Sequence, residues 1–252
     1  MKYTIPANFG NDSIALIQWA HEADLTSVVV TYVDTGWAAP GWTGRVERCK
    51  TWVESLGFQF VLLKPKVDFA TLMLEQKSFP TRKFQWCASF LKGLPLLAWL
   101  DQPANDSGCS ATILIAHRRS ASRAKANLAE FIDESEHYGE RKVWHPLYLQ
   151  STEQRDALVK RAGFELLSHR SLECDPCVNS DASDVLRMDL SVIERTAVLE
   201  QALQQKMLDP DFYRSARNLR EALAEISEPI VMTNHFVEMF EMGCGSPFGC
   251  GL

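Results

Sequence analysis

The chain has 252 residues, of which 46% are hydrophobic and 23% charged, ordinary values that exclude disordered, collagenous and fibrous proteins. No apolar run reaches the roughly 18 residues of a membrane span, and the first residues lack the apolar core of a signal peptide. The net charge of −6 argues against a protein that mainly coats nucleic acid, although it is compatible with a local basic site. We expect a soluble cytoplasmic protein with no membrane contact.

Strand and helix patterns alternate through the first two-thirds of the chain. Short β-branched or apolar runs predict strands at residues 27–33, 58–63 and 112–116, after a short initial strand that ends before residue 8. The spacing of apolar residues predicts helices at residues 14–20 and 45–56. Strands separated by such helices indicate an α/β fold whose parallel sheet is covered on both faces.

The C-terminal part of the chain has a different character. Amphipathic patterns predict helices at residues 190–207 and 216–226, separated by Asp209-Pro210. The composition of residues 103–110 predicts a loop. Residues 243–252 contain four glycines, one proline and two cysteines, which predicts a mobile tail.

Two turns of the predicted sheet are candidate ligand sites. The first is Asn8-Phe9-Gly10-Asn11-Asp12-Ser13, a turn that opens onto a helix, whose free N–H groups and dipole attract anions. The alternative is that Asp12 or Ser13 simply caps the helix. The second is Asp34-Thr35-Gly36, at the strand edge where α/β sheets bind ligands, although Asp and Gly also make ordinary turns there.

A dense basic cluster follows the strand at residues 112–116. It contains Arg118, Arg119, Arg123 and Lys125 within eight positions, and such charges repel one another unless an anion or acidic neighbours compensate. Because arginine suits bidentate phosphate or sulfate contacts, the cluster indicates an anion site. The alternative is a solvated, basic helix start.

The seven cysteines indicate metal binding or catalysis, since an odd number without an export signal makes a disulfide framework improbable. Cys87 and the pair Cys174-Asp175-Pro176-Cys177 form a candidate metal site. Three thiolates can hold a 4Fe–4S cluster with one iron open, whereas zinc needs a fourth ligand such as His169, Cys49 or Cys244. A redox-active C-x-x-C is a further alternative.

Cys250 lies two residues from the C-terminus. A thiol on a flexible, glycine-rich tail can enter a cleft and act as a nucleophile. The alternative is an inert exposed thiol, although cytosolic proteins seldom gain from one. Cys109 and Cys49 are most simply structural.

The order of these motifs resembles the phosphoadenosine phosphosulfate (PAPS) reductase family, within the adenine-nucleotide alpha-hydrolase-like group. Residues 8–13 are similar to that group's S-x-G-x-D-S pyrophosphate loop, and residues 34–36 to its D-T-G. Residues 82–96 resemble the R-W-C…L-K…P-L segment of iron–sulfur members. Matches to R-R-x-x-S (Arg118, Arg119, Ser122), to the H-P-L segment (His145-Pro146-Leu147), to the cysteine pair and to the C-G-L-H ending (Cys250-Gly251-Leu252) follow in order.

The resemblance implies a Rossmann-like parallel-sheet nucleotide-binding domain in residues 1–189, a helical extension in 190–240 and a Cys-containing tail in 241–252. It implies a metal site made of Cys87, Cys174 and Cys177, holding a 4Fe–4S cluster with zinc as the alternative. The implied nucleotide-binding residues are Asn8, Gly10, Asn11, Asp12, Ser13, Asp34, Thr35, Gly36, Arg118, Arg119, Ser122 and Lys125.

The chain departs from the family pattern at several positions. Asn8 and Phe9 replace the usual Ser and Gly, and Asn11 stands where ATP-using members often have Lys. Trp86 replaces the first cysteine of the Cys-Cys pair of adenylyl-sulfate reductases, which leaves three cluster cysteines. The terminal His is absent, and Cys244 is an additional thiol.

The resemblance implies first a sulfonucleotide reductase, with adenylyl sulfate or its 3′-phosphorylated form as substrate. Its Cys250 thiolate would attack the sulfur, and thioredoxin or Cys244 would then release sulfite. The alternative is an ATP-dependent iron–sulfur sulfurtransferase that modifies tRNA or DNA, and the third is a non-catalytic partner in a modification complex. Dimers are common in the resembled family, so a homodimer is one expectation.

Overall fold

The computed structural model describes residues 2–102 and 111–208. Several predictions lie outside these residues. They concern the loop at 103–110, the helix at 216–226, the tail, and the cysteines at positions 109, 244 and 250.

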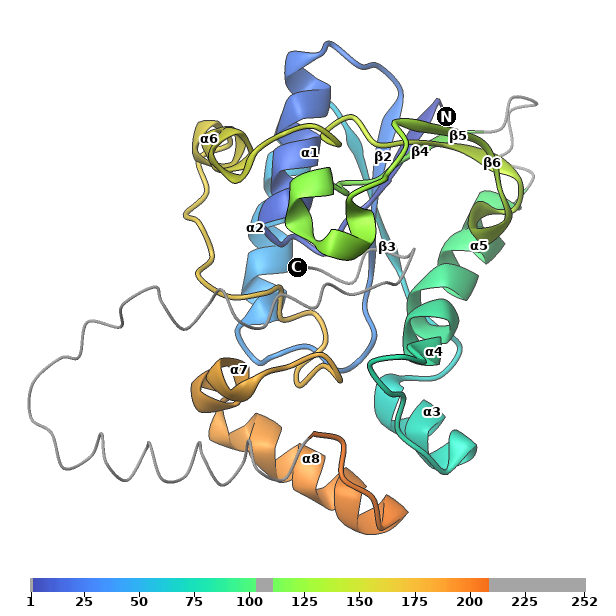
Figure 1. The fold of residues 1–252 in the computed structure, drawn as a ribbon, viewed down its shortest axis with the longest axis vertical. Coiled ribbons are helices and arrows are strands. Elements are labelled where there is room, and N and C mark those ends of the chain that lie inside the picture. The colour runs from blue at the N-terminus through green and yellow to red at the C-terminus, as the bar shows by residue number, and fades with distance from the viewer. Residues whose placement is uncertain (1, 103–110, 209–252) are drawn as a thin grey trace, which may run out of the picture.

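The centre of the fold is a six-stranded sheet of order β3-β2-β1-β4-β6-β5 (Figure 1). Its strands are β1 (Tyr3–Pro6), β2 (Val28–Val33), β3 (Gln59–Leu63), β4 (Thr112–Leu114), β5 (Phe131–Ser135) and β6 (Arg141–Trp144). All neighbours pair in parallel except β5, which is antiparallel to β6 at the edge. The predicted α/β fold is confirmed, and the predicted strands agree with β1 to β4.

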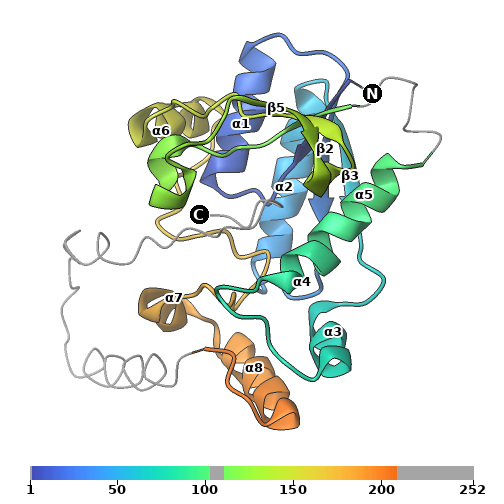
Figure 2. The same ribbon diagram turned by 45° about the vertical axis from the view of Figure 1, so that its right-hand side comes forward.

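Helices cover both faces of the sheet, as the buried strand pattern predicts. One face carries α1 (Asn11–Glu22), α2 (Trp42–Ser55) and α6 (Thr152–Arg161), which share a core with Ile5, Val30 and Leu114. The other face carries α5 (Leu94–Leu100), which packs on a core that includes Ile113. Figure 2 shows α5 on the side of the sheet away from α1.

A third group of helices lies at the end of the molecule opposite the N-terminus (Figure 1). It contains α3 (Phe69–Gln76), α4 (Trp86–Ala88), α7 (Ala182–Arg187) and α8 (Leu190–Leu203). A π-helical turn (Ser89–Gly93) connects α4 to α5. Phe69, Leu91 and Leu199 join α3, the π-helical turn and α8 in one core cluster, against which the three cysteines of the candidate metal site pack.

The helix predicted at residues 190–207 begins as expected, but ends at Leu203 because Gln204 adopts a left-handed conformation with φ 52°. Only this part of the predicted helical extension is described, so its boundary at residue 240 stays a prediction. In the described ranges 2–102 and 111–208, no helix is long and apolar enough to cross a membrane.

Candidate functional site

The predicted site residues meet at the carboxyl edge of the sheet. The loops that leave β1, β2, β4 and β6 carry Asn8, Asp34, Arg118 and His145, and these four strands are parallel. Parallel strands end at the same edge, which is where open α/β sheets bind ligands. Segments far apart in sequence therefore form one candidate site.

The loop after β1 is fixed by the side chain of Asn8. Its Oδ1 accepts hydrogen bonds from the Gly10 N–H at 2.9 Å and the Ser13 hydroxyl at 3.0 Å, and its Nδ2 donates to Ser171 Oγ at 3.1 Å. Phe9 has a φ of 58° and is fully buried. Arg45 Nε donates to the Phe9 carbonyl at 2.8 Å. The side-chain amide of Asn8 thus closes this loop with three hydrogen bonds.

The N-terminus of α1 has no side-chain cap. Its N-cap is Gly10, and Asp12 and Ser13 lie inside the first turn, so the capping alternative is wrong for both. Asn11 instead exchanges two hydrogen bonds with the backbone of Leu167, at 2.9 and 3.0 Å. First-turn N–H groups without a side-chain cap attract an anion.

Asp12 connects this helix end to two arginines. Its Oδ1 accepts from Arg118 Nε at 2.8 Å and from Arg155 Nη1 at 3.3 Å. Arg118 is buried and also donates to Ser120 Oγ at 2.8 Å. The first arginine of the predicted anion cluster is therefore held beside α1 by a carboxylate.

The rest of the basic cluster forms two short 3-10 turns, Arg119–Ala121 and Arg123–Lys125, rather than a helix start. Arg119 donates to the Leu128 carbonyl at 2.8 Å and lies over the Tyr148 ring at 5.1 Å. The buried hydroxyl of Ser122 has no hydrogen-bond partner in the described part of the chain. A hydroxyl in that state can donate to a ligand oxygen.

The loop after β2 connects the sheet edge to the segment that carries the cysteine pair. Asp34 Oδ1 accepts from the Gly36 N–H at 3.0 Å, and Thr35 Oγ1 donates to the Glu173 carbonyl at 3.0 Å. Gly36 has a φ of +70°, and a Cβ there would lie 2.7 Å from Asp68 Cβ. This turn therefore needs glycine and ties the sheet edge to the segment before Cys174.

We expect Gly36→Ala to lower the free energy of unfolding by about 2 kcal/mol, from the left-handed conformation and the contact with Asp68. Gly41→Ala is the control, because a Cβ at Gly41 meets nothing within 4 Å. Urea unfolding of the two variants measures the difference. Equal midpoints would contradict the expectation.

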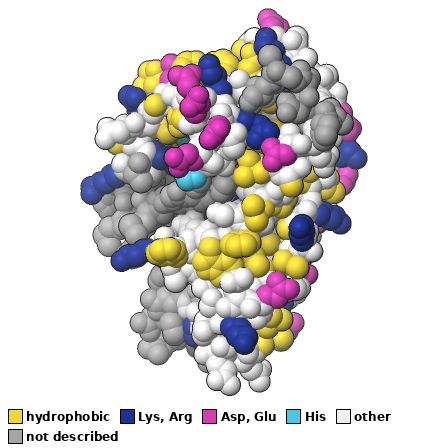
Figure 3. Space-filling view, turned by 90° about the vertical axis from the view of Figure 1, so that its right-hand side faces the viewer, with side chains coloured by type: hydrophobic (Ala, Val, Ile, Leu, Met, Phe, Trp, Pro, Cys, Tyr) yellow, Lys and Arg dark blue, Asp and Glu magenta, His cyan; other side chains and the backbone are white. Residues whose placement is uncertain are grey.

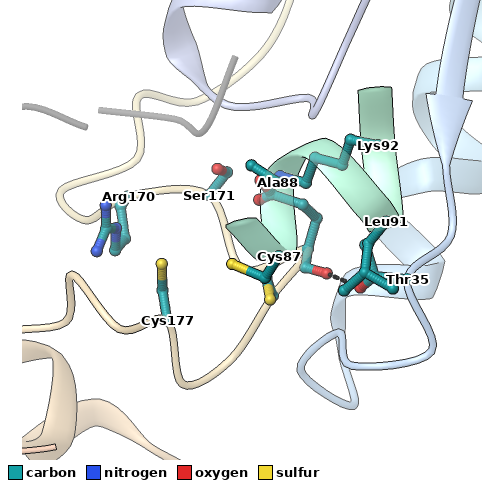
Figure 4. Close-up of a pocket in the computed structure, with 10 residues that line it drawn as sticks. Thr35, Cys87, Ala88, Leu91, Lys92, Arg170, Ser171 and Cys177 are labelled. Carbon is teal, nitrogen blue, oxygen red and sulfur yellow. Dashed lines mark hydrogen bonds and ion pairs between the residues drawn. The ribbon is translucent and has the colours of Figure 1, made fainter. Parts of the chain in front are cut away.

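The three predicted metal cysteines line one pocket (Figure 4). Cys87 comes from α4, whereas Cys174 and Cys177 come from the loop before α7. The pocket has an empty volume of about 410 Å³ that opens to solvent. The three cysteines therefore lie around one pocket, and their role as metal ligands stays a prediction.

The cysteine loop is held by the turn after β2 and by α8. The Asp175 N–H donates to the Trp37 carbonyl at 2.8 Å, and Trp37 Nε1 donates to the Pro176 carbonyl at 3.2 Å. Arg195 donates to the Trp37 and Ala38 carbonyls at 3.1 and 3.0 Å and lies 4.3 Å over the Trp37 ring. Rigid neighbours thus position the loop.

An ion pair separates the cysteine pocket from a second pocket. Lys92 Nζ lies 2.7 Å from Glu173 Oε1, with exposures of only 12% and 5%. Both residues also line a pocket of about 400 Å³ that contains Asn8 and Tyr32. Burial raises the pKa of Glu173, but the charge and hydrogen bond of Lys92 outweigh it and hold that pKa below its ordinary value. The pocket beside Asn8 and the cysteine pocket therefore adjoin.

The donor set suits a thiophilic metal, but the thiols are not yet gathered around one centre. Within the ranges 2–102 and 111–208, no three His, Cys, Asp or Glu side chains are placed to hold a metal ion. Burial, followed by the neighbouring Cys177, raises the pKa of Cys174 well above its ordinary value. A bound metal would supply the positive charge that thiolates need here. The residue types and their shared pocket fit such a metal. To bind it, the three sulfur atoms would have to come closer together.

The same geometry argues against His169 and Cys49 as a fourth zinc ligand, and the pKa of Cys174 argues against a redox-active C-x-x-C. His169 Nδ1 lies 2.6 Å from the Arg170 carbonyl oxygen, and His169 does not line the pocket. Cys49 lies in the main core, where burial raises its pKa to about 12. Neither is brought to the site as a fourth zinc ligand. The raised pKa of Cys174 is the reverse of what a redox-active C-x-x-C requires.

Two histidines pack at the same sheet edge. The rings of His117 and His145 are stacked with centroids 5.7 Å apart and planes at 7°, and His145 Nδ1 lies 2.8 Å from the Ala129 carbonyl oxygen. Burial, with smaller effects of Lys125 and His145, lowers the pKa of His117 to about 3. Burial also lowers the pKa of His145. The pair is therefore neutral at pH 7.

The sequence did not single out Arg155, Ser171, Glu173 or Arg195. Arg155 reaches Asp12 from α6, and Ser171 reaches Asn8 from the cysteine loop. Their partners are more than 140 residues away, so no local pattern could reveal them. The proximity of Glu173 to Cys174 was the one available signal.

Comparison with solved structures finds likeness of fold. The phosphate complex of a phosphoadenylyl-sulfate (PAPS) reductase from Candida auris is 14% identical, covering 66% of this chain and 75% of that one, with a TM-score of 0.47. The U34-tRNA thiolase NcsA from Methanococcus maripaludis, with its 4Fe–4S cluster, is 17% identical (90% and 74% covered, TM-score 0.45). An NH3-dependent NAD synthetase from Campylobacter jejuni is 11% identical (92% and 89%, 0.41).

No protein-family model and no curated protein matches the chain. At these identities the likeness concerns the fold. The activity has to be inferred from the residues of the site.

Proposed function

We propose that the protein is an enzyme of sulfur chemistry on an adenine nucleotide, and that its first activity is sulfonucleotide reduction. The observation that carries this proposal is the shared wall of Lys92 and Glu173 between the cysteine pocket and the pocket beside Asn8. A nucleotide at the sheet edge would thereby lie next to the thiols. The phosphosulfate would bind at the uncapped end of α1, near Arg118.

The chemistry follows from the residues and the substrate. The Cys250 thiol loses its proton, and the thiolate attacks the sulfate sulfur. A new S–S bond forms as the S–O bond to phosphate breaks, so AMP or its 3′-phosphorylated form leaves. A thiol of a thioredoxin-like protein, or Cys244, then attacks Cys250 Sγ, which releases sulfite and leaves a disulfide. Arginine and helix N–H groups stabilise the departing phosphate.

Cys87, Cys174 and Cys177 are the residues that would hold a 4Fe–4S cluster, with zinc as the alternative. When bound, such a cluster would add an iron with an open coordination position beside the nucleotide. Lys92 contributes charge from the shared wall, where Glu173 orients it. In this proposal the protein is soluble, and it either acts alone or pairs as a homodimer.

Sulfite release tests the reductase directly. Anaerobically purified protein, thioredoxin and either adenylyl sulfate or phosphoadenylyl sulfate should yield sulfite from one nucleotide, with Cys250→Ser reduced to the uncatalysed background. Cys49→Ser is the matched control, because Cys49 belongs to the core rather than the site. If neither nucleotide yields sulfite while the cysteine pocket holds its metal, the reductase proposal is wrong.

A second candidate is ATP-dependent sulfur transfer to tRNA or DNA. It is favoured by the count of three cysteines in the pocket, since neither Cys49 nor His169 lines it. A three-thiolate cluster keeps one iron open. Asp12 and Ser13, inside the uncapped first turn, would then help to bind the pyrophosphate of ATP. Release of AMP and pyrophosphate that depends on added nucleic acid would distinguish this activity from the first.

A further inference from the structure

A surface beside the cysteine pocket carries exposed aromatic rings on a rigid support. We define the basic aromatic surface by Arg82, Lys83, Phe84, Phe90 and Leu94, all of which are exposed. Phe84 is 77% exposed, Phe90 45% and Leu94 53%. Figure 3 shows hydrophobic side chains gathered in a band across the middle of this face, with Lys and Arg side chains along its borders.

The most exposed ring belongs to Phe84, whose backbone lies in a closed turn. The Thr81 N–H donates to the Phe84 carbonyl and the Phe84 N–H to the Thr81 carbonyl, each at 3.1 Å. The Phe84 N–H also lies 3.0 Å from Thr81 Oγ1. Exposed apolar side chains that lie together often mark an interaction site. Because the backbone of the turn is already ordered, little backbone freedom is lost when a partner stacks on Phe84.

The turn is attached to the cysteine site. Arg82 Nη2 donates to the Ser180 carbonyl at 3.0 Å, and Gln85 Nε2 lies 3.3 Å from Asn179 Oδ1. Residues 179 and 180 directly follow the C-x-x-C, and Cys87 comes three residues after Phe84. The second ring, Phe90, packs edge-on against Trp86 at 6.3 Å. Any molecule bound on this surface therefore lies next to the thiols.

The charge of this segment is opposite to that of the whole chain. Residues 82–94, which supply the surface, contain three Lys or Arg and no Asp or Glu, whereas the chain has a net charge of −6. Lys92 is ion-paired with Glu173, so Arg82 and Lys83 are the cations of this surface. Lysine is depleted at protein–protein interfaces. Aromatic rings among lysines and arginines are instead the usual means of binding single-stranded nucleic acid, by base stacking and phosphate contacts.

We infer that the basic aromatic surface binds single-stranded nucleic acid and presents it to the cysteine pocket. This inference rests on the second candidate function, in which a nucleic acid accepts the sulfur, and deepens it by naming the surface that binds the polymer. That binding is measurable without turnover. Phe84 and Phe90 stack on unpaired bases, and Lys83 contacts the phosphate backbone. The surface does not read sequence, since it offers rings and charges rather than a set of hydrogen-bond partners.

Binding of labelled oligonucleotides to the full chain tests the inference. The probes are an oligouridine and an oligothymidine of roughly 12 nucleotides, with a duplex of equal length for comparison, each titrated by fluorescence anisotropy. Phe84→Ala should weaken single-strand binding by about 5- to 150-fold, and Phe84→Trp should retain it. Lys83→Gln should reduce the slope of log K against log salt by about 0.7. The two probes distinguish RNA from DNA as the preferred strand.

Matched controls lie on strands β5 and β6, outside the basic aromatic surface. Phe131, on β5, is 49% exposed, and the Lys142 side chain is 50% exposed, so Phe131→Ala and Lys142→Gln should leave binding unchanged. Equal losses in these controls, or preference for the duplex, would overturn the inference. So would unchanged single-strand binding of Phe84→Ala together with a raised KM for thioredoxin, which would mean a protein partner.

The inference and the proposed function can fail separately. Binding of AMP or ATP to wild type and to Phe84→Ala should be equal, because Phe84 lies outside both pockets. Single-strand binding without any nucleotide binding would refute the proposed nucleotide chemistry and support the surface. Nucleotide binding without single-strand binding would refute the basic aromatic surface as a binding site and would support the proposed nucleotide chemistry.

Discussion

Cys177→Ala should lose the metal centre, with iron in anaerobically purified protein falling from roughly four atoms per chain to fewer than one. Cys177 shares a pocket with Cys87 and Cys174, so its removal leaves two thiols where three are needed. Cys87→Ala and Cys174→Ala should behave alike. Iron and sulfide analysis, with the visible absorbance of the cluster, measures the loss.

The matched control is Cys49→Ala. Cys49 is fully buried in the main core and packs among aliphatic side chains of that core, so its removal should cost some stability but no iron. Zinc determined in the same samples decides between the two metals. Full iron in Cys177→Ala, or equal loss in Cys49→Ala, would contradict the assignment of the pocket cysteines as metal ligands.

Metal binding at this site should also release protons. Burial raises the pKa of Cys174 well above its ordinary value, and the negative charge of a neighbouring thiolate raises it further. The metal-free pocket therefore favours neutral thiols, whereas metal ligation requires thiolates.

The sequence predicted those parts of the fold whose pattern is local. Strand β2 is buried along most of its length, so it appears as a continuous β-branched run, Val28–Val33. Strands β5 and β6 were missed: β5 lies at the sheet edge, and β6, which pairs with it, has only one fully buried residue. Four of the five residues of β5, Phe131–Ser135, are exposed, and a strand that faces water needs no apolar run.

The site was predictable in its residue types and not in its pairings. Spacing paired Cys174 with Cys177, the resemblance added Cys87, and all three line one pocket, although their role as metal ligands stays a prediction. The ion pair of Lys92 with Glu173 joins residues 81 positions apart, and that of Asp12 with Arg118 joins residues 106 apart. Such pairs depend on how elements pack in three dimensions. A cluster of charged residues in the sequence can therefore suggest more unpaired charge than the fold leaves. Arg118, which is paired with Asp12, is an example.

The protein should lose stability in acid through His117, by about 3 kcal/mol between pH 7 and pH 4. The folded protein lowers the pKa of His117 from 6.5 to about 3, first through burial and then through the charge of Lys125. The unfolded chain, with a pKa near 6.5, therefore binds the proton more readily throughout this range. The stabilising effect of the neutral ring is complete above pH 6.5 and is lost as the pH falls toward 3.

His117→Gln isolates this effect, because glutamine does not titrate while carboxylates elsewhere titrate equally in both proteins. Urea unfolding at pH 7, 5.5 and 4 should give a free energy that falls less steeply with acid in the variant than in wild type. The difference in slope should be largest between pH 6.5 and 4, where the proton uptake of the two wild-type states differs most. Parallel curves would contradict the lowered pKa of His117 as a source of the acid sensitivity.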